Sequence, residues 1–148
     1  MPFKMVYKSE IIFLQIKITK DPMVKTKRIL FVCSGNRDRS PTAQEIFKRM
    51  LVERGYRASC LEDGPDLDFY VSSAGTYAIS EGRQMTKDIG DQADIIFAMD
   101  EIIEERVLQD YSQPRDKVKR LDISDTFSFG EPMLIELLKK RLEPHLPI

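Results

Sequence analysis

The feature that most restricts the fold of this chain is an apolar run followed directly by a short polar loop and an amphipathic helix. Residues 29–32 are all apolar, as is typical of a strand buried on both faces of a parallel sheet. Ser40 suits a helix N-cap, Pro41 the first helical position and Gly55 the helix end. Between these ends, apolar residues recur on one helical face: Ala43, Ile46, Phe47, Met50 and Leu51. This segment predicts a strand, a tight loop and a helix in succession.

Strand and helix patterns continue to alternate along the rest of the chain. Further strands are predicted at residues 69–71, 94–99 and 118–121. Further helices are predicted near residues 84–89, after an N-cap at Asp100, and from Pro132. The alternation predicts an α/β fold with a four-stranded parallel sheet flanked by helices on both faces. Ligands of such folds bind beyond the carboxyl ends of the strands, and Cys33 ends the first strand.

Length and pattern predict one domain at residues 27–148, preceded by an extension at residues 1–26. The chain has 148 residues, of which 42% are hydrophobic and 32% are charged, which suits a single core with a well-solvated surface. Residues 14–19 alternate between apolar and polar, and Asp21-Pro22 then breaks the pattern. The extension is therefore either an added edge strand or a flexible leader.

Charge and cysteine content exclude several classes of protein. The formal net charge is −1 with both signs interspersed, so nothing favours nucleic acid or an anionic membrane as a partner. No apolar run approaches the ~20 residues of a membrane helix. Two cysteines, Cys33 and Cys60, form no disulfide framework. We therefore expect a cytoplasmic protein with no nucleic-acid or membrane partner.

The loop at residues 33–40 carries the residues with the clearest chemistry. Cys33 is followed six positions later by Arg39 and then by Ser40. A loop between a strand and a helix N-terminus gathers backbone N–H groups around an anion, and the same field favours a cysteine thiolate. A lone cysteine at a strand end is usually a small buried residue. Its combination with Arg39 and Ser40 instead predicts a cysteine that attacks a phosphate.

Residues 32–41 resemble the phosphate loop of the low-molecular-weight protein tyrosine phosphatases, whose pattern is Cys, five residues, Arg and Ser, with Gly and Asn inside. Three later segments resemble family segments in the same order: residues 73–76 (Ser-Ala-Gly-Thr), residues 93–100 and residues 123–127. The resemblance extends over about residues 27–143 and is nearest to a compact branch of predicted tyrosine phosphatases. It implies the three-layer fold of that family and a metal-independent phosphatase that needs no cofactor.

The resemblance also implies a role for individual residues. Cys33 matches the nucleophile, Arg39 the phosphate clamp and Asp125 the general acid. Ser40, which stabilises the sulfur, Asn36, which shapes the loop, and Ser73 match supporting residues. Phosphate binding is expected from the whole loop: Ser34, Gly35, Asn36, Arg37, Asp38, Arg39 and Ser40. Gly35 is expected to permit an awkward backbone dihedral angle.

The chain departs from the family pattern at the acid and beside the arginine. The family usually has Asp-Pro-Tyr where residues 125–127 are Asp-Thr-Phe, and Asp122 is a rival acid. Asp38 stands where many members have a second cysteine, so the local redox switch is expected to be absent. The Asp38 carboxylate would weaken anion binding unless it faces Arg37 or Arg28.

The expected substrate is a phosphorylated protein or a small aryl phosphate, with phosphate, vanadate or sulfate also fitting the loop. Phe127, Phe129 and Tyr77 are candidate walls for a phosphotyrosine ring. His145 is expected at the surface. Two alternatives remain open. An arsenate reductase of the same fold would need further cysteines, of which only Cys60 is available. A non-catalytic phosphoprotein- or anion-binding module is the other.

Overall fold

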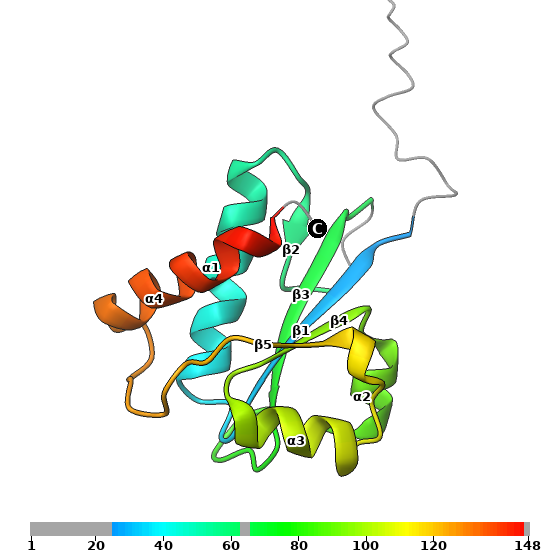
Figure 1. The fold of residues 1–148 in the computed structure, drawn as a ribbon. Coiled ribbons are helices and arrows are strands. Elements are labelled where there is room, and N and C mark those ends of the chain that lie inside the picture. Colours follow the sequence, from blue (N-terminus) through cyan, green and yellow to red (C-terminus); the bar gives the residue numbers. More distant parts are fainter. Residues whose placement is uncertain (1–24, 63–65, 147–148) are drawn as a thin grey trace, which may run out of the picture.

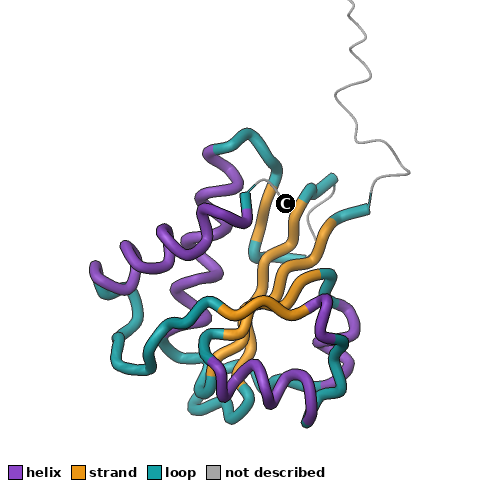
Figure 2. The backbone as a smooth tube through the Cα atoms, in the orientation of Figure 1, coloured by secondary structure: helices purple, strands orange, loops and turns teal. Residues whose placement is uncertain are grey.

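The computed structural model describes residues 25–62 and 66–146. Apart from Lys25 and Thr26, the predicted N-terminal extension lies outside these residues. Five parallel strands form one sheet in the order β2-β3-β1-β4-β5 (Figures 1 and 2). The strands are β1 (Lys27–Cys33), β2 (Ala58–Ser59), β3 (Phe69–Gly75), β4 (Ile95–Ala98) and β5 (Val118–Arg120).

The predicted α/β class and parallel sheet are confirmed, but the predicted number of strands is wrong by one. The additional strand is β2, a two-residue edge strand that pairs only with the start of β3. A segment this short cannot show a period of two residues, so no alternation marks it in the sequence. β1, β4 and β5 coincide closely with the predicted apolar runs, whereas β3 begins at the predicted residue and extends four residues further, to Gly75.

Helices cover both faces of the sheet, which gives three layers (Figure 1). On one face lie α1 (Arg39–Glu53) and α4 (Pro132–Leu142), and on the other lie α2 (Lys87–Gln92) and α3 (Glu101–Gln109). Single 3₁₀ turns form at Arg115–Lys117 and Glu143–His145. None of the helices within the described residues is long and apolar enough to cross a membrane.

Alternate residues of the central strand β1 serve the two cores. Ile29 and Phe31 belong to the core beneath α1 and α4, whereas Leu30 and Val32 belong to the core beneath α2 and α3. In the first core the ring of Phe31 stacks on Phe97 with centroids 5.0 Å apart. The continuous apolar run of β1 is thereby explained, because a strand covered on both faces has no solvent-facing side.

His145 lies at the margin of the first core and not on the open surface that the sequence predicted. It is half-buried, and its ring meets Phe97 edge-on with centroids 5.0 Å apart. Burial lowers the pKa of His145, and the positive charge of Lys119 lowers it further. The prediction failed because a proline-flanked tail gives no periodic signal, whereas the turn after α4 returns the chain to the sheet.

The carboxyl ends of the strands bring the predicted site residues to one rim. In the β1–β3 pair Cys33 lies opposite Gly75, and in the β1–β4 pair Val32 lies opposite Ala98. The segments that follow β3, β4 and β5 therefore begin beside the loop that follows β1. This is the edge at which ligands bind in open α/β sheets.

Candidate active site

The phosphate loop is held open by the segment that follows β3, which we call the brace (residues 75–84). Three carbonyl oxygens of the loop accept hydrogen bonds from it: Cys33 from Thr76 N–H at 2.9 Å, Ser34 from Tyr77 N–H at 2.7 Å and Gly35 from Ile79 N–H at 3.1 Å. In a planar trans peptide the C=O and the following N–H point in opposite directions. With these carbonyls turned toward the brace, the amide groups that follow them are turned toward the inside of the loop.

Close approach between the brace and the loop requires glycine at position 75. A Cβ atom on Gly75 would lie 2.7 Å from both the backbone nitrogen of Asn36 and the backbone oxygen of Ser34. The expected awkward dihedral angle is found at Asn36, with φ of 52°, and not at Gly35. Gly35 is instead favoured by the lack of space for a side chain, because a Cβ atom there would lie 2.9 Å from the Ile79 side chain.

The sulfur of Cys33 receives hydrogen bonds at the floor of the loop. Its Sγ lies 2.9 Å from Ser40 Oγ and accepts the backbone N–H of Asn36 at 3.2 Å. Ser40 Oγ itself accepts Asn36 Nδ2 at 3.0 Å, and among the described residues its only other acceptor within reach is the Ala74 carbonyl at 3.5 Å. The single hydroxyl proton of Ser40 is therefore best directed at the sulfur, where it stabilises negative charge.

Asn36 connects the sulfur to β3 and to helix α1. Its Nδ2 group also donates to Ser73 Oγ at 3.0 Å, and Ser73 in turn donates to Gln44 Oε1 at 2.7 Å. Its Oδ1 accepts the backbone N–H of Arg83 in the brace. One amide side chain thus fixes the loop to three neighbouring segments. Helix α1 begins at Arg39, with Asp38 as N-cap, so the expected N-cap at Ser40 is wrong. The Ser40 hydroxyl faces the sulfur and does not cap the helix.

Arg39 is buried, with 2% of its surface exposed, and its guanidinium is held from behind. Its Nη1 donates to Asp100 Oδ2 at 2.7 Å and to the Ile123 carbonyl at 2.7 Å. Its Nη2 lies 3.4 Å from Ser34 Oγ. Asp100 also caps α3 as predicted, because its Oδ1 accepts the Ile103 N–H at 2.9 Å. The planar fork is thereby fixed in orientation at the rim of the loop.

Asp125 reaches the same cavity from the segment that follows β5, which we call the acid loop (residues 124–131). Its Oδ1 lies 3.4 Å from Arg39 Nε. The rival Asp122 pairs with Arg120 at 3.0 Å and is absent from the lining of the cavity. Ile123, which lies between them in the chain, is fully buried. The geometry favours Asp125.

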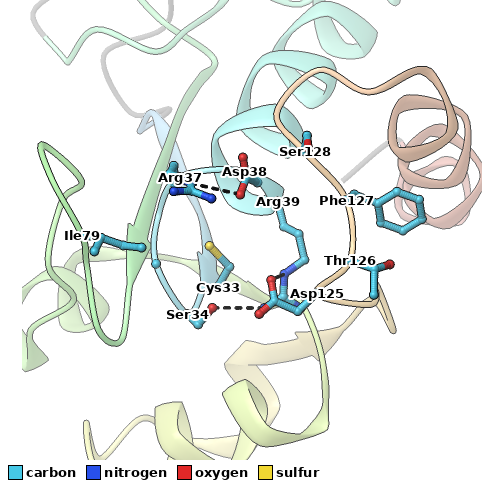
Figure 3. Close-up of a pocket in the computed structure, with 11 residues that line it drawn as sticks. Cys33, Ser34, Arg37, Asp38, Arg39, Ile79, Asp125, Thr126, Phe127 and Ser128 are labelled. Carbon is cyan, nitrogen blue, oxygen red and sulfur yellow. Dashed lines mark hydrogen bonds and ion pairs between the residues drawn. The ribbon is translucent and has the colours of Figure 1, made fainter.

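The cavity at the rim has a volume of about 350 Å³. Figure 3 shows Cys33 beneath it, with Asp38, Arg39 and Asp125 around it and Ile79 on the opposite wall. The lining residues are Cys33, Ser34, Gly35, Arg37, Asp38, Arg39, Ile79, Asp125, Thr126, Phe127 and Ser128. Among the described residues no group of three or more His, Cys, Asp or Glu side chains is arranged to hold a metal ion.

The expected aromatic walls are not formed as predicted. Phe129 and Tyr77 do not line the cavity, and their side chains are exposed. Phe127 lines it, but its ring points away from Cys33 (Figure 3) and packs against the core beneath α4. The aliphatic side chain of Ile79 is the apolar group on the opposite side. The sequence of a loop does not show whether an aromatic side chain lines a cavity or packs against the core.

Sequence reasoning missed several residues that hold the site. Asp100 was identified only as a helix cap, and Gln44 and Thr42 only as positions within a helix. Each of these contacts joins residues far apart in the chain, so no local pattern marks them.

Cys60 lies far from the nucleophile. It directly follows Ser59, which pairs with Tyr70, whereas Cys33 pairs with Gly75 at the other end of β3. Five residues of strand span about 16 Å. Burial raises the pKa of the Cys60 thiol, and the nearby Glu45 carboxylate raises it further.

Comparisons with known proteins agree with this geometry. Residues 28–89 match the family model described as low molecular weight phosphotyrosine protein phosphatase. A protein-arginine-phosphatase of Bacillus subtilis (strain 168) is 27% identical over 124 residues, which cover 70% of this chain and 75% of the relative.

Solved structures share the fold. The solution structure of a low molecular weight protein tyrosine phosphatase from Bacillus subtilis has a TM-score of 0.59 and 25% identity, covering 79% of this chain and 97% of that chain. The tyrosine phosphatase Wzb from Escherichia coli K30, in complex with phosphate, has a TM-score of 0.60 and 18% identity, covering 82% and 96%.

The fold and the cysteine loop together define a cysteine-dependent phosphatase. The match over β1, α1 and β3 includes the whole phosphate loop and the whole brace. Over residues 28–89 this chain is similar to the low-molecular-weight phosphotyrosine protein phosphatase family.

Proposed function

We propose that this protein hydrolyses phosphotyrosine-like phosphomonoesters through a phosphocysteine intermediate, without a metal ion. The observation that carries the proposal is the position of Cys33 Sγ, which lies below the cavity with Ser40 Oγ at 2.9 Å and Asn36 N at 3.2 Å. Two donors at this distance stabilise a thiolate and, later, a thiolate leaving group.

In the first step the Cys33 sulfur attacks phosphorus and the bond from phosphorus to the leaving oxygen breaks. The loop amides and the Arg39 guanidinium bind the phosphoryl oxygens, whose charge they stabilise as the transition state forms. The carboxyl group of Asp125 gives its proton to the leaving oxygen. The alcohol or phenol leaves, and the phosphoryl group stays on sulfur.

In the second step a water oxygen attacks phosphorus and the sulfur–phosphorus bond breaks. The Asp125 carboxylate takes a proton from that water, which restores the acid. The electron pair of the broken bond returns to the Cys33 sulfur, which leaves as a thiolate and accepts a hydrogen bond from the Ser40 hydroxyl. Inorganic phosphate leaves the loop.

Phosphoarginine is a second candidate substrate. The ring of Phe127 points away from the cavity, so no aromatic wall selects a phenyl ring. The 27% identical relative is a protein-arginine-phosphatase. An arsenate reductase is disfavoured, because that chemistry passes a disulfide between cysteines and Cys60 lies beyond the ~7 Å reach of a disulfide from Cys33.

The proposal is tested by hydrolysis of an aryl phosphate in the presence of a chelator, with wild-type protein and Cys33→Ser. We expect turnover in the wild type and none in the variant. An acid quench during turnover should trap a phosphoryl group on Cys33.

The same assay with phosphotyrosine and phosphoarginine, compared by kcat/KM, decides between the two substrates. Equal hydrolysis by wild type and Cys33→Ser would refute the mechanism. Tight phosphopeptide binding without turnover would instead indicate a binding module.

A further inference from the structure

Asp38 occupies the N-cap position of α1, yet its side chain makes no hydrogen bond to the amides of that helix. Its Oδ1 instead accepts the backbone N–H of Phe129 in the acid loop, at 2.9 Å and 91 residues away in the chain. Its Oδ2 lies 3.3 Å from Arg37 Nε. An aspartate at an N-cap usually satisfies the first turn of its own helix, so the direction of this carboxylate calls for another explanation.

Thr42, one turn into α1, makes a parallel contact. Its hydroxyl donates to the Asp38 carbonyl at 2.7 Å and accepts the N–H of Gly130 at 3.0 Å. Two successive amides of the acid loop are therefore bound by two side chains at the start of α1. We call this pair of contacts the clasp.

We propose that Asp38 is a positioning residue that holds the acid loop, and with it Asp125, against the phosphate loop. The inference rests on the proposed function, since it assigns Asp125 as the acid. Asp38 lies within the phosphate loop, five residues after Cys33, and Asp125 lies four residues before Phe129. The clasp thus sets the distance between the phosphate loop, whose Cys33 attacks phosphorus, and Asp125, which protonates the leaving oxygen.

The rest of the acid loop shows why a second anchor is needed. Its first end is fixed by Ile123, whose N–H donates to the Met99 carbonyl at 2.7 Å and whose carbonyl accepts Arg39. Asp125 itself is two-thirds exposed, with Arg39 as its ion-pair partner. The proline that usually follows the acid in the family is replaced by Thr126, which leaves the backbone less restricted. The clasp supplies the restraint at the other end.

The carboxylate acts here as a charged acceptor for a neutral amide, a stronger contact than that between two neutral groups. Its negative charge lies beside the loop that binds an anion, which costs affinity for phosphate. Arg37 offsets that cost in part by pairing with the other oxygen. Removal of Asp38 is therefore expected to impair the acid while leaving anion binding equal or tighter, and these two effects can be measured separately.

The test compares Asp38→Ala, which removes the acceptor, with Asp38→Asn, which keeps an oxygen for the Phe129 amide. Each is assayed on phosphotyrosine, whose phenol has a pKa near 10, and on 2,4-dinitrophenyl phosphate, whose phenol leaves without a proton. Asp38→Ala should lower kcat/KM for phosphotyrosine about 10- to 100-fold, the usual effect of misplacing a catalytic group by about 1 Å. Because kcat/KM depends only on the steps up to phosphoryl transfer to Cys33, kcat/KM for the dinitrophenyl ester should change about 3-fold or less, and KM should not rise.

Asp38→Asn should recover most of the lost kcat/KM, and Thr42→Val should show the same leaving-group pattern in kcat/KM as Asp38→Ala in weaker form. Faster hydrogen exchange at the Phe129 and Gly130 amides of Asp38→Ala would report the open clasp directly. Equal losses for both esters, or no loss, would overturn the inference.

The outcome is distinguishable from failure of the proposed function. If Asp125→Asn shows the leaving-group pattern while Asp38→Ala does not, only the role of Asp38 is refuted. If Cys33→Ser hydrolyses either ester as fast as wild type, both proposals fall together.

Discussion

Asp100 binds Arg39 with one carboxylate oxygen and caps α3 with the other, at 2.7 Å to Arg39 Nη1 and 2.9 Å to the Ile103 amide. The helix that follows β4 is thereby tied to the guanidinium that follows β1. Because Arg39 is almost fully buried, its orientation depends on this partner and on the Ile123 carbonyl. Loss of a partner leaves a buried charge uncompensated.

Asp100→Asn is expected to fold, since asparagine also caps helices, but to lose the ion pair with Arg39. We expect a fall in kcat/KM of about 10- to 100-fold, as for the loss of about 1.5–3 kcal/mol of a hydrogen bond to a charged group. Steady-state kinetics with an aryl phosphate measures this fall in kcat/KM.

Thr86→Ala is the matched control, because Thr86 caps α2 in the same way, through the Ile89 amide, and lies outside the cavity. It should lose about 1 kcal/mol of stability and keep its activity. Equal activity of the two variants would contradict the role of Asp100.

Asp125→Asn is expected to lower kcat about 10²- to 10⁴-fold on phosphotyrosine, the usual contribution of a general acid. Asp122→Asn should stay within about 2-fold of wild type, because its carboxylate pairs with Arg120 away from the cavity. The pH profile of kcat should lose the part that reports titration of a carboxyl group in the Asp125 variant and keep it in the Asp122 variant. The reverse result would assign the acid to Asp122.

Gly75→Ala is expected to disrupt the phosphate loop. The added methyl group would lie 2.7 Å from two backbone atoms of the loop, which cannot yield as a side chain can. Overpacking of this kind costs about 1–3 kcal/mol and displaces the backbone. We expect a lower melting temperature and little remaining turnover. Ser72→Ala, three positions earlier on the same strand, is the control and should retain both. A Gly75→Ala protein with wild-type kinetics would show that the brace does not need this close approach.

Peroxide treatment is expected to oxidise Cys33 without forming a disulfide to Cys60. The register of β3 separates the two by about 16 Å along the strands, beyond the ~7 Å between Cα atoms that a disulfide spans. Because burial raises the pKa of the Cys60 thiol, Cys60 should also alkylate slowly with iodoacetamide at neutral pH. Non-reducing peptide mapping and alkylation of Cys33→Ser measure the two effects. A peptide that joins Cys33 and Cys60 would contradict the separation.

Acidification from about pH 7 to pH 5.5 is expected to lower the free energy of unfolding through His145. Its pKa is lowered in the folded protein, chiefly by burial, so the unfolded chain binds the proton more readily below its ordinary pKa near 6.5. The contribution of neutral His145 to the free energy of unfolding is therefore present above that pH and lost below it. His145→Phe keeps an edge contact with Phe97 and should show a shallower pH dependence in urea unfolding. Identical slopes would exclude His145 as the titrating group.

The sequence was most informative where the signal is local. The run at residues 29–32, the cap at Asp100 and the proline at the start of α4 each predicted their element, because each depends on neighbouring residues. The cysteine, arginine and serine of the loop were recognisable for the same reason. Residues 1–24 lie outside the described residues, so the expectation of an edge strand or leader there is untested.

The contacts that shape the site were not predictable, because they join distant segments. Asp38 accepts an amide 91 residues away, and Arg39 donates to a carbonyl 84 residues away. The backbone angle expected at Gly35 is found at Asn36, since the side chain of Asn36 must reach three neighbours at once. Such a demand arises only when the segments are packed together.

The hydrogen bonds from the brace to three successive loop carbonyls have a thermodynamic consequence for substrate choice. Folding has already met the entropic cost of arranging the amides, so an arriving anion need not organise them. Every monoester, and free phosphate as well, should gain the same share of affinity from this cradle. Discrimination among esters must then arise from whatever lies beyond the bridging oxygen, where Ile79 and the acid loop face the leaving group.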